Sequence, residues 1–576
     1  MSLRYNTYGG GFVFIKVSGK KVYLVEGYRN KDNKVRHRTI KCYGNLKELE
    51  ADDPNIIDKL KKEAKVLTKE KKQESDMTEN EVKITHSLLK KNSDQEKDKN
   101  YGYFFLENIY NALEISEFLK SFSFEKNHRF NIDEILKMLI FARILNPESK
   151  KKTFEKRDEY FKPFKCALNS VYRSLTQMDE IKGDLQVHLN RKVSETYGRD
   201  ASLVFYDVTN YYFETDIEDD FKKKGVSKDK KRTPLVQMGL LIDNKGLPIG
   251  YQLFPGNTND ISTLIPFLAD VREKYKLGRI ILTADKGLNS GKNLTHLLSK
   301  GDGYIVSQKV RGGSKKFIKE VLDEEGYLSN PSNTFKIKSF VRERRVKNEF
   351  GEYEIIKEKC VCFWSKNYND REKKKREKLE ERLIDYLEHP SKYKASNRYG
   401  LKKYIKENTV DKATGEIKDV EPVLTFEKEK YERDVALDGY YVLVSSELEM
   451  TNAEIIENYR GLWKIEDSFR VIKSDLEGRP VYVTRKDHVE AHFLICFIAL
   501  LISRILEMKL DYNYSIKRIR DSLRDATCRS IGKGIYSLSK QNEVFEAITK
   551  LYNVDMNRSF VKVETIKKWY RDLKTT

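Results

Sequence analysis

The sequence predicts a mixed α/β protein built on a five-strand mixed sheet with flanking helices. Three β-rich segments between residues 202 and 256 are followed by a helix, a strand, a second helix and a final strand that ends near 307. This β-β-β-α-β-α-β order is typical of a sheet with helices packed against it. A helical region precedes the sheet and a long charged segment interrupts it, so the 576 residues should form several domains.

The composition limits the class of partner. The chain carries 110 Lys and Arg against 89 Asp and Glu, a formal net charge of +21. Such an excess indicates a polyanionic partner, most simply nucleic acid, although a soluble basic protein could also carry it. Met1–Gly10 lacks the apolar segment of a signal peptide, and the apolar run Phe493–Ile502 is too short to cross a bilayer. We therefore expect a cytoplasmic protein without a membrane partner.

Two segments precede the helical region. Residues 11–43 alternate apolar and polar side chains in two or three runs joined by turns, which predicts a β-rich module that includes a β-hairpin. Residues 55–100 are strongly charged and contain no aromatic side chain. They are expected to form an exposed helix or a linker.

Residues 103–197 follow a helical pattern. Asn146–Pro147 and Lys162–Pro163 mark breaks between helices. The segment 170–178 could be the second helix of a helix-turn-helix with Arg173 pointing outward, but an ordinary helical bundle is favoured because nothing distinguishes the turn. The expected helices span residues 106–120, 132–145, 151–160, 168–176 and 182–196.

Two aspartates stand out in the predicted sheet. Asp207 lies inside the first strand, SLVFYDVTNYYFE, and Asp285 ends the apolar fourth strand, RIILTADKGL. A carboxylate in apolar surroundings is costly to bury without a partner, and at the mouth of a sheet it can hold a cation. Asp285 could instead cap the turn that follows it. Capping explains Asp207 less well, because more strand follows that residue.

Residues 310–440 interrupt the sheet pattern. They contain strand-rich portions and a charged helix at 369–387. We expect a mainly β domain inserted into the sheet domain. Its density of Lys and Arg indicates a surface that contacts the phosphates along a nucleic-acid backbone. The charged helix could equally be a solvated one held by Glu–Lys pairs four residues apart.

The stretch YRGLWKIEDSFRVIK, residues 459–473, is predicted to be the interior of one helix. Thr451 is its N-cap, and Glu454, three residues later, completes a capping-box pattern. Tyr459, Glu466 and Lys473 are spaced seven apart, so they should project from one face. A solvated, salt-bridged face is the usual meaning of such a pattern. The opposite stripe has the spacing of a helix packed on a core and consists of Leu462, Ile465, Phe469 and Ile472.

Asp207, Asp285 and Glu466 together suggest a metal site. Mg²⁺ prefers oxygen ligands and keeps waters and substrate phosphate oxygens. Two such ions about 4 Å apart activate the attacking water or hydroxyl and stabilise the leaving oxygen of a phosphoryl displacement. His488 and His492 could hold zinc, but no third ligand is evident, so a structural role or a phosphate contact is favoured.

The chain resembles the DDE transposases of bacterial insertion sequences, in the group with the signature Tyr-x2-Arg-x3-Glu-x6-Lys. The resemblance rests on four motifs in the family's order, namely FYDVTNYYFE around Asp207, PGNTND at 255–260, LTADKGLNSGKNL around Asp285 and YRGLWKIEDSFRVIKS at 459–474. It implies a ribonuclease-H-like catalytic domain. It also implies that Asp207, Asp285 and Glu466 are catalytic and bind two Mg²⁺ ions, for which Mn²⁺ can substitute.

The same resemblance assigns contacts to DNA. It implies that Tyr459 and Lys473 contact DNA phosphates near the cleaved end. The signature arginine falls at position 462, which is a leucine in this sequence. Arg460 or Arg470 could supply the missing charge, and Arg470 is preferred because it lies one helical turn after the signature glutamate.

Trp364 is a further candidate for DNA binding, because members of the family use an aromatic residue to hold a flipped base. It is the only tryptophan of the predicted insertion. The sequence leaves open whether this side chain binds DNA or simply packs.

The resemblance implies a transposase that binds the terminal inverted repeats of an insertion sequence as a homodimer, cleaves the ends and joins the 3′-OH to target DNA in the bacterial nucleoid. Two alternatives stay open: a non-catalytic DNA-binding remnant or regulator, and a metal-dependent nuclease without strand transfer. The expected domains are a β-rich module (1–60), a charged linker or helix (61–100), a helical DNA-binding domain (101–198), the catalytic domain (199–309 and 441–511), the insertion (310–440) and a helical basic region (512–576).

Overall fold

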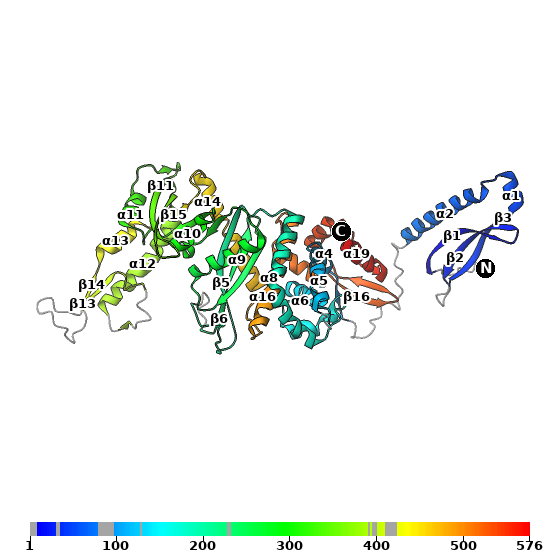
Figure 1. Cartoon of the computed structure of the whole chain (residues 1–576), viewed down its shortest axis with the longest axis horizontal. Coiled ribbons are helices and arrows are strands. Elements are labelled where there is room, and N and C mark those ends of the chain that lie inside the picture. The colour runs from blue at the N-terminus through cyan, green and yellow to red at the C-terminus, as the bar shows by residue number, and fades with distance from the viewer. Residues whose placement is uncertain are drawn as a thin grey trace. The chain divides into compact units, whose positions relative to one another are not determined.

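Figure 1 shows the computed structural model of the chain. The chain divides into two compact units. The first comprises Met1–Lys97, Cys528–Leu538 and Arg558–Lys568, and the second comprises Asp98–Thr527, Ser539–Asn557 and Trp569–Thr576. The structure describes residues 8–29, 35–78, 97–126, 130–226, 232–389, 392–393, 400–408 and 423–575.

The N-terminal part of the first unit is a three-stranded antiparallel sheet with a helix packed on it. Gly19, at φ 65°, makes the turn between the first two strands. The hydroxyl of Thr68 donates to the carbonyl of Val13 at 3.0 Å and so ties the second helix to the first strand. Part of the charged segment expected at 55–100 forms this helix, and residues 79–96 lie outside the described residues. The elements are β1 (Tyr8–Ser18), β2 (Lys21–Arg29), β3 (Val35–Asn45), α1 (Leu46–Asp52) and α2 (Ile56–Thr78).

The C-terminal region contains a hairpin where a helix was expected. Within the predicted helical region 512–576, the first helix ends at Asp525, and the chain then forms two antiparallel strands around a tight turn. The turn explains the error, because Gly532, Lys533 and Gly534 all have positive φ, which ends any helix. The elements are α17 (Ile516–Asp525), β16 (Thr527–Gly532), β17 (Ile535–Leu538), α18 (Glu543–Leu551), β18 (Phe560–Lys562) and α19 (Val563–Thr575).

The second unit begins with a helical bundle. Its last helix, α8 (Leu168–Tyr197), is one continuous element of 30 residues, so the prediction of two helices and a turn here was wrong. No Gly or Pro separates the two predicted pieces, and the buried side chains Met178 and Ile181 continue the packing stripe across the expected break. The candidate recognition helix at 170–178 forms the first part of α8. The other helices are α4 (Tyr103–Ala112), α5 (Ile115–Lys126), α6 (Ile132–Leu145) and α7 (Lys150–Glu155).

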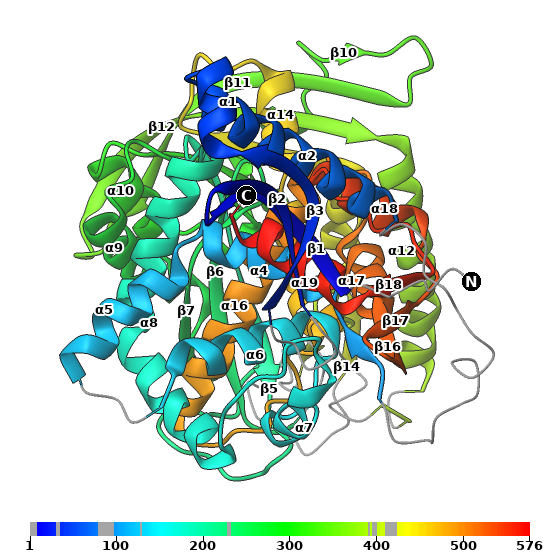
Figure 2. The ribbon, with the colours of Figure 1, turned by 90° about the vertical axis from the view of Figure 1, so that its right-hand side faces the viewer.

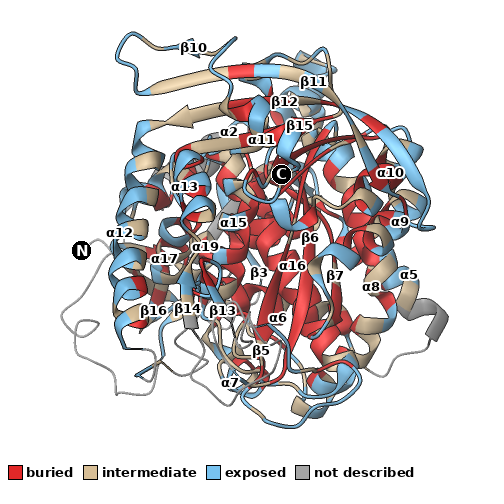
Figure 3. Cartoon of the chain, turned by 90° about the vertical axis from the view of Figure 1, so that its left-hand side faces the viewer, coloured by how far each residue is buried: buried red, intermediate tan, exposed pale blue. Residues whose placement is uncertain are grey.

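The most apolar helix of the chain, α16 (Lys486–Lys509), lies between the bundle helices α4, α6 and α8 and one edge of the large sheet (Figure 2). By length and composition it is the one described helix that could cross a membrane, yet its apolar stretch is completely buried inside the fold (Figure 3). Its burial confirms the prediction of a core helix at 493–502.

A buried basic cluster lies between α16 and the bundle. The ammonium of Lys150 is 3.2 Å from Nδ1 of His492, and Arg143 donates to the carbonyls of Leu476 and Glu477. Burial, with the nearby charge of Arg143, lowers the pKa of Lys150 to about 7. Burial also holds the pKa of His492 well below its usual value. The histidine is therefore neutral and structural, as favoured from the sequence.

We expect the free energy of unfolding to rise between pH 7 and pH 9 more steeply in the native chain than in Lys150→Met. Above pH 7 the unfolded chain keeps the Lys150 proton that the folded chain has released, so a higher pH favours the folded state. The effect can reach about 1.4 kcal/mol per pH unit. Urea unfolding across this range measures it, with the exposed Lys151→Met as the control. The same pH dependence of the unfolding free energy in the native chain and in Lys150→Met would contradict the lowered pKa of Lys150.

A nine-stranded mixed sheet forms the centre of the second unit. The strand order is β10-β11-β12-β15-β9-β8-β5-β6-β7, in which β5, β8 and β9 run parallel to one another and every other adjacent pair is antiparallel. The strands are β5 (Leu203–Tyr212), β6 (Leu235–Asp243), β7 (Pro248–Pro255), β8 (Ile281–Ala284), β9 (Gly303–Gln308), β10 (Leu328–Ser329), β11 (Phe335–Lys347), β12 (Tyr353–Ser365) and β15 (Tyr440–Ser445).

The prediction of five strands was therefore too low. The five predicted strands are neighbours in the sheet, but four more extend it beyond β9. Strand β15 pairs with β9, and β12 pairs with β15, because the centre of β12 is apolar and fully buried at Cys360, Val361 and Cys362. Strands expected in a separate domain thus continue the main sheet.

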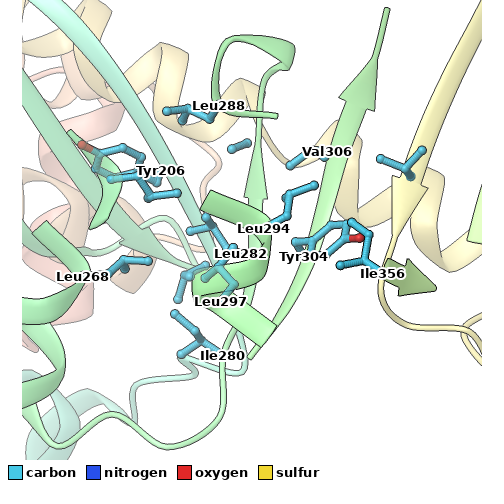
Figure 4. Packing of buried hydrophobic residues seen from close by; sticks show 14 of the residues in the cluster. Tyr206, Leu268, Ile280, Leu282, Leu288, Leu294, Leu297, Tyr304, Val306 and Ile356 are labelled. Atoms are coloured by element: carbon cyan, nitrogen blue, oxygen red, sulfur yellow. The ribbon is translucent and has the colours of Figure 1, made fainter. Parts of the chain in front are cut away.

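One face of the sheet is covered by α9 (Leu264–Tyr275) and α10 (Gly291–Ser299), which bury a single large apolar cluster (Figure 4). Val204, Tyr206 and Val208 of β5 point into this cluster. Because side chains alternate along a strand, the residues between them face the other side of the sheet.

Residues 310–440 are mixed rather than mainly β. The charged helix predicted at 369–387 is confirmed as α12 (Lys366–Glu388), and it packs with neighbouring segments in a small apolar cluster around Leu383 and Tyr404. The remaining elements are α11 (Lys315–Leu322), α13 (Lys428–Ala436), β13 (Ile405–Asn408) and β14 (Val423–Phe426).

Candidate active site

The sheet brings Asp207 and Asp285 side by side. Strands β5 and β8 are parallel, with Phe205 beside Thr283, and the same register extended by two residues sets Asp207 beside Asp285. Adjacent strands lie about 4.8 Å apart. Leu282 and Ala284 belong to the apolar cluster under α9 and α10, so alternation directs both aspartates to the other face of the sheet. Asp207 is half-buried and Asp285 is exposed at the end of its strand.

Asp285 is oriented by two hydroxyl groups. Its Oδ1 accepts hydrogen bonds from Oγ of Ser307 on β9 at 3.2 Å and from the hydroxyl of Tyr459 at 3.4 Å. The Tyr459 oxygen is also 2.9 Å from the hydroxyl of Tyr441. Burial, together with Tyr441, raises the pKa of Tyr459 far above its usual value, so the phenol stays protonated and can donate. Tyr459 is thus part of the site around Asp285.

The helix predicted over 459–473 is broken. The structure has α14 (Asn452–Arg460), α15 (Trp463–Arg470) and a π-helical turn, η5 (Val471–Asp475). The predicted capping box at Thr451 is confirmed. The break falls at Gly461, where an added Cβ would lie 2.4 Å from Cζ of Phe205. The absence of a side chain at this position allows the helix to lie directly against β5.

Glu466 lies on the segment that runs along β5. Gly461 packs on Phe205, and further along the chain Nζ of Lys473 donates to Oγ1 of Thr209 at 2.6 Å. The segment between them therefore passes Asp207, which lies between these two residues of β5 on the same face of the strand. Glu466 is near its middle and is exposed.

The three carboxylates are not gathered around one point. Within the part of the chain that the structure describes, no three His, Cys, Asp or Glu side chains are close enough together to hold one metal ion. The structure therefore pairs the two aspartates and places Glu466 on the flanking helix. All three donors are carboxylate oxygens, which suit a hard cation such as Mg²⁺ better than a transition metal.

The remaining candidate residues lie in different surroundings. Arg470 pairs with Asp467 at 2.9 Å and with Asp475 at 3.0 Å, so its charge is partly neutralised. Arg460 is exposed at the end of α14, and Leu462 is half-buried at the helix break. His488 lies beside Asp487 rather than in a zinc site.

Trp364 is half-buried on β12. Its indole N–H donates to the carbonyl of Asp438 at 3.1 Å, and the ring packs closely on Gly439. These contacts show that the tryptophan side chain packs against the segment at Asp438 and Gly439.

Sequence reasoning missed a polar network next to Asp285. Nδ2 of Asn289 donates to the carbonyl of Ser307 at 2.9 Å and to Oε1 of Gln308 at 3.0 Å. Arg344 of β11 donates to Gln308 at 2.8 Å and to Asn289 at 3.2 Å. The LNSGKNL motif contains Asn289 and could have indicated it. No local signal marks Arg344, which reaches the network only through the extension of the sheet.

The chain matches the models of two protein families. A family model described as "Transposase DDE domain" matches residues 198–502, which is more than half of the chain and includes both aspartates, Glu466 and α14–α15. The chain belongs to this family of transposase domains. A model described as "IS1634 family transposase, N-terminal domain" matches residues 15–81, and the two matches together confirm the predicted relation to insertion-sequence DDE transposases.

Two solved structures show only weak overall likeness. A piggyBac transposase synaptic complex with hairpin DNA has 9% sequence identity and a TM-score of 0.31, over 87% of this chain and 86% of that chain. A Mos1 transposase paired-end complex with the left transposon end has 12% identity and a TM-score of 0.14, over 31% of this chain and 58% of that chain. The search of curated proteins found no match.

Proposed function

We propose that this protein binds the terminal inverted repeats of an insertion sequence, cleaves the element's ends and joins the freed 3′-OH to target DNA. The observation that carries the proposal is the pairing of Asp207 with Asp285 on adjacent parallel strands, with α14 and α15 against them. The five neighbouring strands β7-β6-β5-β8-β9 support treating this part of the sheet as the ribonuclease-H-like core that the resemblance implies.

Asp207, Asp285 and Glu466 are the residues that would hold Mg²⁺. Two bound ions would supply activation of the attacking water or 3′-OH and stabilisation of the leaving oxygen. Ser307 and Tyr459 fix the orientation of Asp285, which is the role of residues that support metal ligands. Glu466, exposed on α15, would be the third carboxylate ligand.

Lys473 and Arg460 are the cations near these carboxylates that we propose contact the DNA substrate. Lys473 is held beside Asp207 by its hydrogen bond to Thr209, where its ammonium can contact a phosphate next to the cleaved bond. Arg460 is a second cation that can contact a DNA phosphate. Tyr459 orients Asp285 through its hydrogen bond and can also contact the DNA end directly. The net charge of +21 supports a duplex partner, bound by a homodimer.

We expect Lys473→Ala to weaken DNA binding and to lower the slope of log K against log salt by about 0.9, the value of one phosphate contact. Anisotropy titrations of an inverted-repeat duplex at several salt concentrations measure the slope. Lys276→Ala, an exposed lysine outside the site, is the matched control. A slope equal to that of the native protein would contradict the phosphate contact.

A cleavage assay tests the function as a whole. The native protein should nick labelled inverted-repeat DNA when Mg²⁺ is present and produce molecules in which an element end is joined to target DNA. Nicks without joined products would favour a metal-dependent nuclease. Specific binding without nicks would favour a DNA-binding remnant or regulator.

A further inference from the structure

A basic cavity of about 810 Å³ lies in the 310–440 segment, and none of its lining residues belongs to the site described above. Of its eleven lining residues, six are cations and two are carboxylates, and Ile318 and Leu322 add an apolar surface. We call it the basic cavity. Its cations, which come from α11, α13 and the chain near them, are Arg311, Lys315, Lys319, Lys403, Lys430 and Arg433.

Half of these cations already have anionic partners. Arg311 pairs with Asp438 and Glu372, Lys403 pairs with Asp434, and Lys430 pairs with Glu427 at 3.0 Å.

The other half are not neutralised. Lys315, Lys319 and Arg433 are exposed, and no carboxylate of the described residues lies within 4.0 Å of their charged groups. The cavity therefore presents three available positive charges against one lining carboxylate, Asp323, that pairs with no cation of the described residues.

The position of Lys315 adds to the positive potential. It is the first residue of α11, whose first turn contains no acidic side chain. The helix dipole makes that end positive, so a cation there is unfavourable unless an anion binds nearby. Lys319 lies one turn further along the same helix, and Arg433 reaches the cavity from α13.

We propose that the basic cavity binds backbone phosphates of the DNA substrate outside the active site. Lysine and arginine are the side chains that bind phosphate, and arginine can do so with two parallel hydrogen bonds. Three available cations on two helices favour a polyanion that offers more than one phosphate, and the DNA of the proposed function is such a polyanion. This inference rests on the proposed function, in which DNA is the substrate.

The test compares two full-length triple variants in duplex-binding titrations against salt. Lys315→Gln, Lys319→Gln and Arg433→Gln together should lower the salt slope by about 2.7, at about 0.9 for each phosphate that the variant no longer binds. Lys274→Gln, Lys276→Gln and Lys300→Gln remove the same formal charge from exposed positions at the C-terminal ends of α9 and α10, and should leave the slope unchanged. Thermal unfolding of both proteins checks that they fold.

A cavity variant with the slope of the native protein, or with the slope of the control variant, would overturn the proposal. Calorimetry with pyrophosphate separates the two sources of phosphate. Saturable pyrophosphate binding that is abolished in the cavity variant, while its DNA slope is unchanged, would identify a free-anion site and also overturn the proposal. Absence of Mg²⁺-dependent nicking by the native protein would contradict the proposed function. It would not affect the comparison of salt slopes, which tests the basic cavity alone.

Discussion

Asp285→Ala and Asp207→Ala should each abolish cleavage and strand transfer while leaving binding to the element's ends largely intact. Each substitution removes a carboxylate from the pair that parallel strands β5 and β8 place side by side. Loss of a group that stabilises transition-state charge lowers a rate by about 10²–10³-fold or more. Glu466→Ala should have the same effect, since its carboxylate completes the set. The measurement is Mg²⁺-dependent nicking of labelled inverted-repeat DNA, with binding followed separately.

The matched control is Asp270→Ala, which removes an exposed carboxylate from α9, where Asp270 pairs with Lys274. It should nick as fast as the native protein. Undiminished nicking by all three active-site variants would refute the assignment of these carboxylates.

Gly461→Ala should reduce cleavage by about 10²-fold, the cost of a displacement of about 1 Å in an active site. The new Cβ would lie 2.4 Å from Cζ and 2.7 Å from Cε1 of Phe205, so the helix must move away from β5. That shift carries Glu466 away from Asp207. Overpacking of this kind also costs about 1–3 kcal/mol of stability.

Two variants make the Gly461 result specific. Gly278→Ala adds the same methyl group where nothing lies within 4 Å, so its activity should equal that of the native protein. Phe205→Leu combined with Gly461→Ala removes the clashing ring atoms and should restore part of the cleavage activity. A fully active Gly461→Ala protein would show that the close approach to β5 does not position Glu466.

Local sequence patterns predicted much of this site. Asp207 and Asp285 were singled out because a carboxylate in an apolar strand is costly to bury, and their joint role was implied by the family resemblance. The capping box at Thr451 and the burial of α16 were also predicted from local patterns, and both are confirmed.

Long-range contacts account for the errors. The spacing of seven residues predicted one regular helix over 459–473, but the helix is broken at Gly461, where it lies against Phe205 of β5. The nine-stranded sheet depends on pairing between β15 and β9, which are far apart in sequence. The position of Arg344 beside Asn289 follows from that pairing and could not be predicted from residues near either one.

The most direct test of a metal-dependent active site is cleavage by Asp207→Cys with Mg²⁺ and with Mn²⁺. A thiolate is a poor ligand for Mg²⁺ and a better one for softer metals. The variant should therefore be inactive with Mg²⁺ and regain nicking with Mn²⁺, whereas the native protein nicks with either ion and stops when the metal is removed by a chelator. Undiminished nicking by Asp207→Cys with Mg²⁺, or by the native protein in the presence of a chelator, would contradict the assignment.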